Sequence, residues 1–208
     1  MKIFCAQLNP IIGDIQGNLE KLESSCQAAV SENASLLVTS ECFITGYPPR
    51  DLLQASFFIE KMRAVPESLQ ALSEKFPELG ILVGHPVVDG SKLFNSACLY
   101  VNGKCVFRTD KCLLPNYDVF DEKRYFKPGQ LAKCFEFNGV KLGVHICEDA
   151  WFDSEEYAFD PLEMLAKLKP DLMINLSASP FETAKQARRI QHFTDLSIYY
   201  NVPFLWVN

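Results

Sequence analysis

The sequence predicts a layered α/β or α+β domain, in which helices cover the faces of a mixed β-sheet. Short apolar runs alternate with segments that repeat their apolar residues at helical spacing. Two Asn-Gly dipeptides, at 102–103 and 138–139, are each flanked by strand-like residues and predict β-hairpins. The 208 residues contain no solenoid repeat, low-complexity tract or linker. These observations together favour a single folded unit.

Strands and helices alternate through the first half of the chain. The predicted elements are a strand at 2–8, a helix at 17–33, a strand at 35–40, a helix at 57–76 and a strand at 80–88. In the first helix, the residues at helical spacing are Leu19, Leu22, Cys26 and Ala29 with Val30.

The second half contains the two hairpins and then returns to alternation. The later elements are a helix at 161–168, a strand at 171–177, a helix at 183–200 and a strand at 202–207. Between the hairpins, residues 111–130 (KCLLPNYDVFDEKRYFKPGQ) show no regular pattern. Irregular segments of this length are uncommon in compact domains and are often functional.

Composition and charge exclude several classes of protein. The hydrophobic content of 48% and charged content of 22% are typical of a globular domain. The net charge of −6 argues against a nucleic-acid or anionic-membrane partner. Polar residues and a proline interrupt the start, MKIFCAQLNP, so no signal peptide is expected. No apolar run approaches the roughly 18 residues that span a bilayer, and we expect a cytoplasmic protein.

The eight cysteines are expected to be reduced thiols. No two of them have CxxC spacing, and no secretory signal points to an oxidising compartment. The three histidines, His85, His145 and His192, are not spaced with cysteines as zinc ligands are. We therefore expect no metal site.

Charged or nucleophilic residues follow three predicted strands at the point where each strand ends. Glu41 follows SLLVTS, Lys111 follows CVFRTD and Cys147 follows VKLGVHI. Ligands in layered α/β folds collect at the carboxyl ends of strands. Each residue alone also has an ordinary interpretation, as a solvated acid, a surface lysine and a buried core thiol.

The chemistry of the three residues is complementary. A cysteine thiolate is a nucleophile, a nearby ammonium lowers the thiol pKa, and a carboxylate can accept the thiol proton. Lysine can also stabilise the oxyanion that forms when sulfur attacks a carbonyl, together with a backbone N–H just after the nucleophile. This set of roles fits hydrolysis of an amide or a nitrile.

A Cys-His pairing is the rival catalytic arrangement. His145 precedes Cys147 by two residues, so in a strand both would face the same side, about 6.5–7 Å apart. That separation is too long for a hydrogen bond, and a satisfied core histidine is the favoured interpretation. His85 could reach Cys147 only if the fold brings their strands together.

Three segments carry a resemblance to a known family. The sequences around Glu41, Lys111 and Cys147 resemble the nitrilase, or carbon–nitrogen hydrolase, superfamily with its Glu-Lys-Cys triad. More narrowly, ECFITGYPPRDLL, LPNYDVFDEKRYF and CEDAW resemble the N-terminal glutaminase domain of glutamine-dependent NAD⁺ synthetases. The resemblance covers residues 1–208 and implies a four-layer α-β-β-α sandwich, cut short at its C-terminal end.

The resemblance implies a role for each matching residue. Cys147 would attack the side-chain amide of L-glutamine and form a thioester, with Glu41 as general base and acid. Lys111 would stabilise the tetrahedral intermediate, and Glu122 would orient Lys111. The implied substrate-binding residues are Tyr47, Tyr117, Glu148, Ser179 and Lys185. Arg188 or Arg189 could replace Lys185 as the cation that holds the glutamine α-carboxylate.

Two departures from the family bear on the rest of the protein. The chain lacks the SGGxDS-type phosphate loop of a synthetase domain, and the strand pair that usually follows VPFLWVN is absent. The resemblance therefore implies a synthetase domain elsewhere that would bind ATP with Mg²⁺ and deamido-NAD⁺, with no cofactor in this domain. A homo-oligomer is also expected, and an incomplete sheet would leave an open edge.

Two alternatives remain open. A free-standing nitrilase-like amidase would hydrolyse another small amide with little need for an α-amino acid. A non-catalytic domain that retains the fold for assembly would show no selective alkylation of Cys147.

Overall fold

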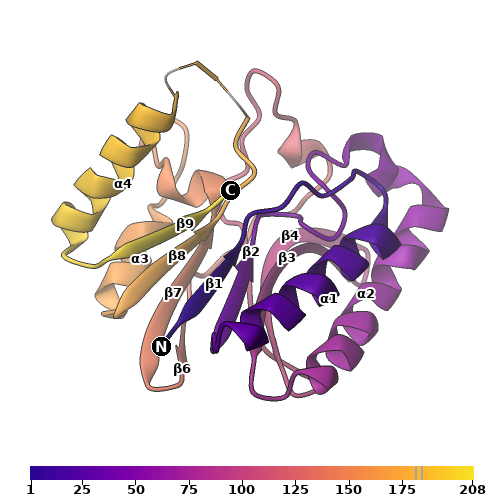
Figure 1. Ribbon diagram of the computed structural model, residues 1–208. Helices are drawn as coiled ribbons and strands as arrows, with labels where there is room; N and C mark the ends of the chain where they lie inside the picture. Colours follow the sequence, from indigo (N-terminus) through magenta and orange to yellow (C-terminus); the bar gives the residue numbers. More distant parts are fainter. Residues whose placement is uncertain (181, 184) are drawn as a thin grey trace.

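The computed structural model describes residues 1–180, 182–183 and 185–208. Two β-sheets lie between two layers of helices (Figure 1). The five-stranded sheet has the order β1-β2-β3-β4-β5, and the four-stranded sheet has the order β6-β7-β8-β9. The two sheets therefore divide the chain into an earlier and a later half.

The five-stranded sheet begins parallel and ends antiparallel. Its strands are β1 (Ile3–Ala6), β2 (Leu36–Thr39), β3 (Gly80–Asp89), β4 (Lys92–Val101) and β5 (Lys104–Asp110). β1, β2 and β3 pair in parallel, and β3, β4 and β5 pair antiparallel. Helices α1 (Ile15–Ser31) and α2 (Ser56–Lys75) cover the outer face of this sheet (Figure 1).

Two tight turns connect β3, β4 and β5. The predicted turn at Asn102-Gly103 is confirmed, and both residues have positive φ angles of 44° and 78°. Turns of this kind require positive φ at both positions, which Asn and Gly tolerate best. A second turn at Gly90-Ser91 joins β3 to β4. This turn was not predicted from the sequence, although the Asp89-Gly90 dipeptide is itself a turn signal.

The four-stranded sheet contains the second predicted hairpin. Its strands are β6 (Cys134–Phe137), β7 (Val140–Ile146), β8 (Leu172–Leu176) and β9 (Phe204–Val207). β6 and β7 form the hairpin at Asn138-Gly139, and β7, β8 and β9 pair in parallel. Helices α3 (Pro161–Lys167) and α4 (Lys185–Tyr200) cover its outer face (Figure 1). Residue 184, within the predicted helix 183–200, lies outside the described residues.

An apolar layer joins the two sheets. Leu82, Ala97 and Leu99 of the first sheet pack in one buried cluster with Val144 and Ile174 of the second. Complete burial of such side chains stabilises the fold by about 1.5–3 kcal/mol each. Separate clusters attach the helices to the outer faces of the two sheets. The predicted four-layer α-β-β-α architecture is therefore confirmed.

The segment 111–130 crosses the ends of the strands without joining either sheet. Its only regular part is the 3₁₀ turn η2 (Glu122–Arg124), within the fully described range 1–180. The described part of the chain contains no helix that is both apolar and long enough to span a membrane.

Candidate active site

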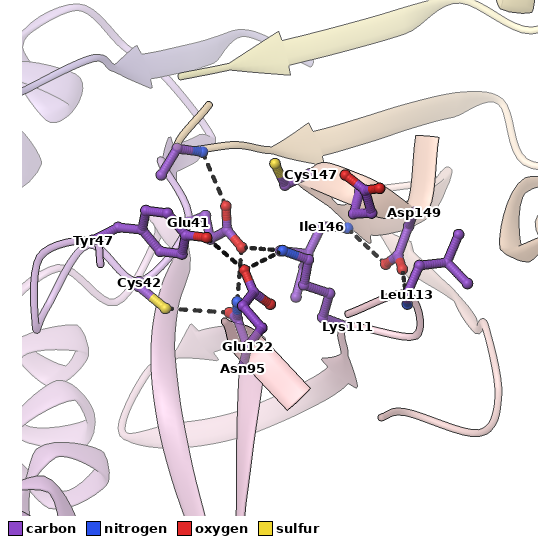
Figure 2. Close-up of polar contacts among 12 residues, drawn as sticks. Glu41, Cys42, Tyr47, Asn95, Lys111, Leu113, Glu122, Ile146, Cys147 and Asp149 are labelled. Carbon is purple, nitrogen blue, oxygen red and sulfur yellow. Dashed lines mark hydrogen bonds and ion pairs between the residues drawn. The ribbon is translucent and has the colours of Figure 1, made fainter. Parts of the chain in front are cut away.

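The ammonium of Lys111 lies between two buried carboxylates. Its Nζ donates to Glu41 Oε1 at 2.8 Å and to Glu122 Oε1 at 2.7 Å (Figure 2). Glu41 and Lys111 are each 1% exposed, and Glu122 is 4% exposed. The structure thus brings together side chains that follow β2 and β5 and one that lies on η2.

The electrostatics of this group depend on its burial. Burial disfavours the ammonium, but the carboxylates of Glu122 and Glu41 outweigh it and hold the pKa of Lys111 well above its ordinary value. Burial and the negative charge of Glu41 raise the pKa of Glu122, although Lys111 opposes this. Lys111 is therefore a fixed positive charge in a region without solvent.

Asn95 on β4 holds two members of this group and was not predicted from the sequence. Its side-chain amide donates to Glu41 Oε1 at 2.7 Å, and its backbone carbonyl accepts from the Lys111 N–H at 2.8 Å. The backbone N–H of Ala178 donates to Glu41 Oε2 at 3.0 Å. In the sequence, the only sign of a special role for Asn95 is that it is a polar residue within the strand-like run FNSACLYV.

Cys147 leaves the strand β7 with a turn in its backbone. It opens the 3₁₀ turn η3 (Cys147–Ala150) and has a φ angle of +43°. Positive φ is unusual for a residue with a side chain, and such residues concentrate at functional sites. The side chain borders a cavity of about 480 Å³.

The charges of Glu41 and Lys111 both influence the pKa of the Cys147 thiol. Burial is the largest influence and raises the pKa of Cys147 to about 12, with Glu41 adding to the rise and Lys111 opposing it. Lys111 lowers the pKa of Cys147, as expected of a nearby ammonium, but burial and Glu41 outweigh it. The thiol is protonated at neutral pH, so a reaction through sulfur needs a base.

Glu148 projects toward the same cavity and is held by two tyrosines. Tyr117 donates to its two oxygens at 3.0 and 3.1 Å, and Tyr157 donates to Oε1 at 3.0 Å. Burial raises the pKa of Glu148, while the two tyrosine hydrogen bonds counter that rise. Tyr157 was not predicted, because it lies in the irregular run 151–160, which has no pattern that marks it.

Ser179, Lys185 and Arg188 border the cavity on the side of α4. Glu182 lies 3.9 Å from Lys185 and also forms an ion pair with Arg188. Arg189 is placed differently. It is buried, donates to the Pro180 carbonyl at 2.9 Å, and lies 5.2 Å over the Trp206 ring.

Tyr47 lies behind the lysine rather than at the cavity beside Cys147. Its hydroxyl donates to Glu122 Oε1 at 2.6 Å. Tyr47 and Glu122 border an adjacent cavity of about 340 Å³. This position suits a residue that orients Glu122, whereas its role in substrate binding stays a prediction.

No histidine is hydrogen-bonded to Cys147 in the described part of the chain, and two expectations about His145 are wrong. Its side chain packs against the Phe204 ring at 5.8 Å, in the layer of α3 and α4. Cys147 instead packs between the sheets, because its positive φ ends the strand alternation that placed both residues on one face. Neither ring nitrogen of His145 has a hydrogen-bond partner in the described part of the chain, so it is not a satisfied core histidine. His85 bonds the Tyr100 hydroxyl at 3.1 Å within the first sheet.

Cysteine, histidine and acidic side chains are the residue types that most often ligate a metal ion. All eight cysteines are free thiols. Within residues 1–180, 182–183 and 185–208, no three His, Cys, Asp or Glu side chains are grouped as ligands for a metal ion.

A glutamate, a lysine and a cysteine at the ends of β2, β5 and β7 in a four-layer sandwich define a recognisable class of hydrolase. The carbon–nitrogen hydrolase family model matches residues 2–182. The chain belongs to the carbon–nitrogen hydrolase family.

Several relatives in this family are glutamine-dependent NAD⁺ synthetases. The chain is 41% identical to that of Synechocystis sp., with 99% of this chain and 39% of the relative aligned. It is 34% identical to the glutamine-dependent NAD⁺ synthetase of Thermotoga maritima, with 100% of this chain and 35% of the relative aligned. The chain therefore spans less than two fifths of the length of these curated relatives.

Solved structures give the same comparison in three dimensions. The glutamine-dependent NAD⁺ synthetase of Acinetobacter baumannii, solved with ADP, matches with a TM-score of 0.89 and 30% identity over 98% of this chain and 37% of its own. An amidase from Nesterenkonia sp. matches with a TM-score of 0.85 over 100% of this chain and 75% of its own. At 20% identity, the amidase supports the fold alone.

Proposed function

We propose that residues 1–208 form a glutamine amidohydrolase domain that releases ammonia through a cysteinyl thioester. The observation that carries the proposal is the buried group in which Lys111 contacts Glu41 and Glu122 at 2.8 and 2.7 Å. The charges of this group act on the Cys147 thiol. A fixed ammonium and a carboxylate beside a protonated thiol supply what amide hydrolysis needs.

The proposed reaction has two stages. Glu41 accepts the Cys147 proton as sulfur attacks the side-chain amide carbon of glutamine, and the Lys111 ammonium and the Glu148 N–H stabilise the oxyanion. The proton then passes from Glu41 to the leaving nitrogen, the C–N bond breaks, and ammonia departs. In the second stage, water loses a proton to Glu41 and attacks the thioester. The C–S bond breaks, glutamate is released, and Glu41 returns the proton to the Cys147 sulfur, which restores the thiol.

The polar groups around the cavity support glutamine as the substrate. The Glu148 carboxylate, held by Tyr117 and Tyr157, suits a substrate ammonium. Ser179 with Lys185 suits a substrate carboxylate. A cavity with an acid on one side and cations on another matches an α-amino acid that carries an amide.

The relatives support a place in NAD⁺ synthesis. These relatives are glutamine-dependent NAD⁺ synthetases. We propose that this domain supplies ammonia to a synthetase domain C-terminal in the full-length protein. That domain would bind ATP with Mg²⁺ and deamido-NAD⁺ and form NAD⁺, and the hydrolase domain would need no cofactor. We also propose a cytoplasmic location, which the free cysteines suit, and a homo-oligomer.

A free-standing amidase is the second candidate function, because the Nesterenkonia amidase shares the fold over the whole chain. Ammonia release from glutamine should be compared with release from the analogue that lacks the α-amino group. We expect strong preference for glutamine, lost in Glu148→Gln. Equal turnover of both amides favours the amidase, and no turnover by a folded protein favours a non-catalytic domain.

A further inference from the structure

The carboxylate of Asp149 binds two separate parts of the chain with its two oxygens. Oδ1 accepts from the backbone N–H groups of Cys112 at 2.9 Å and Leu113 at 2.8 Å. Oδ2 accepts from the backbone N–H of Ile146 at 3.0 Å (Figure 2). Asp149 is 2% exposed, so water does not replace these bonds.

The two segments that Asp149 joins carry the lysine and the nucleophile. Cys112 follows Lys111, the first residue after β5 of the first sheet. Ile146 is the last residue of β7 in the second sheet and directly precedes Cys147. The apolar packing between the sheets has no direction of its own. Charge-assisted hydrogen bonds, in contrast, fix both distance and angle. The Asp149 carboxylate is therefore a rigid polar connection across the two sheets at the site.

We propose that Asp149 is a positioning residue, which sets the distance between the Lys111 ammonium and the Cys147 thiol by holding the backbone beside each of them. This inference rests on the proposed function, because it concerns the same site. Both oxygens of Asp149 are occupied by backbone N–H groups. Asp149 therefore acts through Lys111 and Cys147 and does not contact the substrate.

The two-sided arrangement makes asparagine an informative replacement. Asn has the shape of Asp, but it has one acceptor oxygen and one NH₂ donor. If its oxygen faces Cys112 and Leu113, the NH₂ group meets the Ile146 N–H; if it faces Ile146, the other two N–H groups lose their acceptor. In either orientation Asp149→Asn releases one segment and keeps the other.

The chain offers a matched control in Asp160, at the N-terminus of α3. Its Oδ1 accepts from the N–H groups of Leu162 at 2.8 Å and Glu163 at 3.3 Å, and its Oδ2 accepts from the Tyr200 hydroxyl at 2.9 Å. Asp160→Asn therefore makes the same chemical change to a carboxylate that accepts three hydrogen bonds. Asp160, however, does not connect the segments that carry Lys111 and Cys147.

The test is steady-state ammonia release from glutamine by the wild type and both variants, with the melting temperature of each. We expect Asp149→Asn to lower kcat roughly 10- to 100-fold, since small misplacements of catalytic groups have effects of this size. KM should stay within about threefold, because substrate contacts are intact. Asp160→Asn should leave kcat unchanged and the melting temperature close to that of the wild type, because Asn caps a helix about as well as Asp and the Tyr200 hydroxyl can accept from its NH₂ group.

Several results would overturn the inference. The inference is wrong if the folded Asp149→Asn variant keeps the kcat of the wild type. It is also wrong if Asp160→Asn lowers kcat as much as Asp149→Asn does. If Asp149→Asn does not fold, Asp149→Glu replaces it. The added methylene shifts the connection, so its kcat should also fall, and a wild-type kcat would contradict the inference.

Alkylation separates this inference from the proposed function. If the wild type releases no ammonia from glutamine, the proposed function fails on its own. The rate of iodoacetamide alkylation at Cys147 then tests Asp149 without catalysis. A rate changed several-fold in Asp149→Asn but not in Asp160→Asn supports the positioning role, and equal rates in all three proteins overturn it.

Discussion

The inner and outer ends of the candidate site differ in how firmly their charges are held. At the inner end, Lys111 is 1% exposed and contacts two carboxylates at 2.7–2.8 Å. At the outer end, the Lys185 and Arg188 side chains are 23% and 63% exposed and share Glu182. Charge interactions are strong where water is excluded and weak where it is not. The inner end should therefore govern the rate of the chemistry, and the outer end should modestly affect substrate affinity.

The largest expected effect is the loss of the nucleophile. Cys147→Ala should abolish ammonia release from glutamine, because no thioester can form. The far-UV circular dichroism spectrum should be unchanged, since the side chain is small. Turnover by the folded variant at the wild-type rate would remove Cys147 from the mechanism.

Lys111 should affect both turnover and stability. Lys111→Met should lower turnover about 100- to 1,000-fold through loss of oxyanion stabilisation. It should also lower the free energy of unfolding by about 3–5 kcal/mol, because it leaves Glu41 and Glu122 buried without their cation.

A double variant separates the two effects of Lys111. Lys111→Met with Glu122→Gln removes one of the uncompensated charges, so urea unfolding should show partial recovery of stability. Ammonia release should stay low. Recovery of both quantities would mean that Lys111 has only a structural role.

The strand-end pattern explains why the inner residues were predictable from the sequence. Glu41, Lys111 and Cys147 each follow an apolar run, and parallel or hairpin pairing brings the ends of such runs together. Both Asn-Gly hairpins were predictable from local signals, whereas the four layers were implied only by the resemblance to the carbon–nitrogen hydrolase superfamily.

The supporting residues were not predictable, because tertiary contacts define their roles. Asn95 is one polar residue in a strand, and Asp149 is one of two adjacent acids; only the structure gives their partners. The prediction that His145 and Cys147 face the same side was wrong, because the alternation of side chains along a strand does not reveal the positive φ of Cys147. Tyr157 reaches Glu148 from an irregular segment.

Glu148 lies between the two ends and should have an intermediate effect. Glu148→Gln removes the charge that we assign to the substrate ammonium and should lower kcat/KM for glutamine roughly 10- to 100-fold, mostly through KM. Tyr157→Phe is the milder companion variant, with a loss of up to about tenfold. An unchanged KM in Glu148→Gln would contradict this assignment.

The outer cations should have small and unequal effects. Lys185→Ala should raise the KM for glutamine by roughly fivefold, the effect of a partly exposed ion pair. Arg188→Ala should change KM less, because its side chain is more exposed. The reverse order would assign the substrate carboxylate to Arg188.

His145 should affect acid stability and leave catalysis largely intact. Burial lowers the pKa of His145 to about 3, so the folded state favours the neutral ring. Its contribution to stability is complete above pH 6.5, the ordinary histidine pKa, and is lost as the pH falls toward 3, by up to about 1.4 kcal/mol per pH unit. Urea unfolding should show that the free energy of unfolding falls less between pH 7 and pH 4.5 for His145→Ala than for the wild type. Collapse of turnover in the folded variant would favour the Cys-His pairing.

The most direct test of the site is the mass of the protein during turnover. Samples quenched in acid while glutamine is being hydrolysed should be analysed by intact-mass and peptide mass spectrometry. Our account predicts one γ-glutamyl group, the mass of glutamine less ammonia, attached to Cys147 and to none of the other seven cysteines. Ammonia release with no adduct at Cys147 in any quenched sample, or an adduct on a different residue, would contradict it.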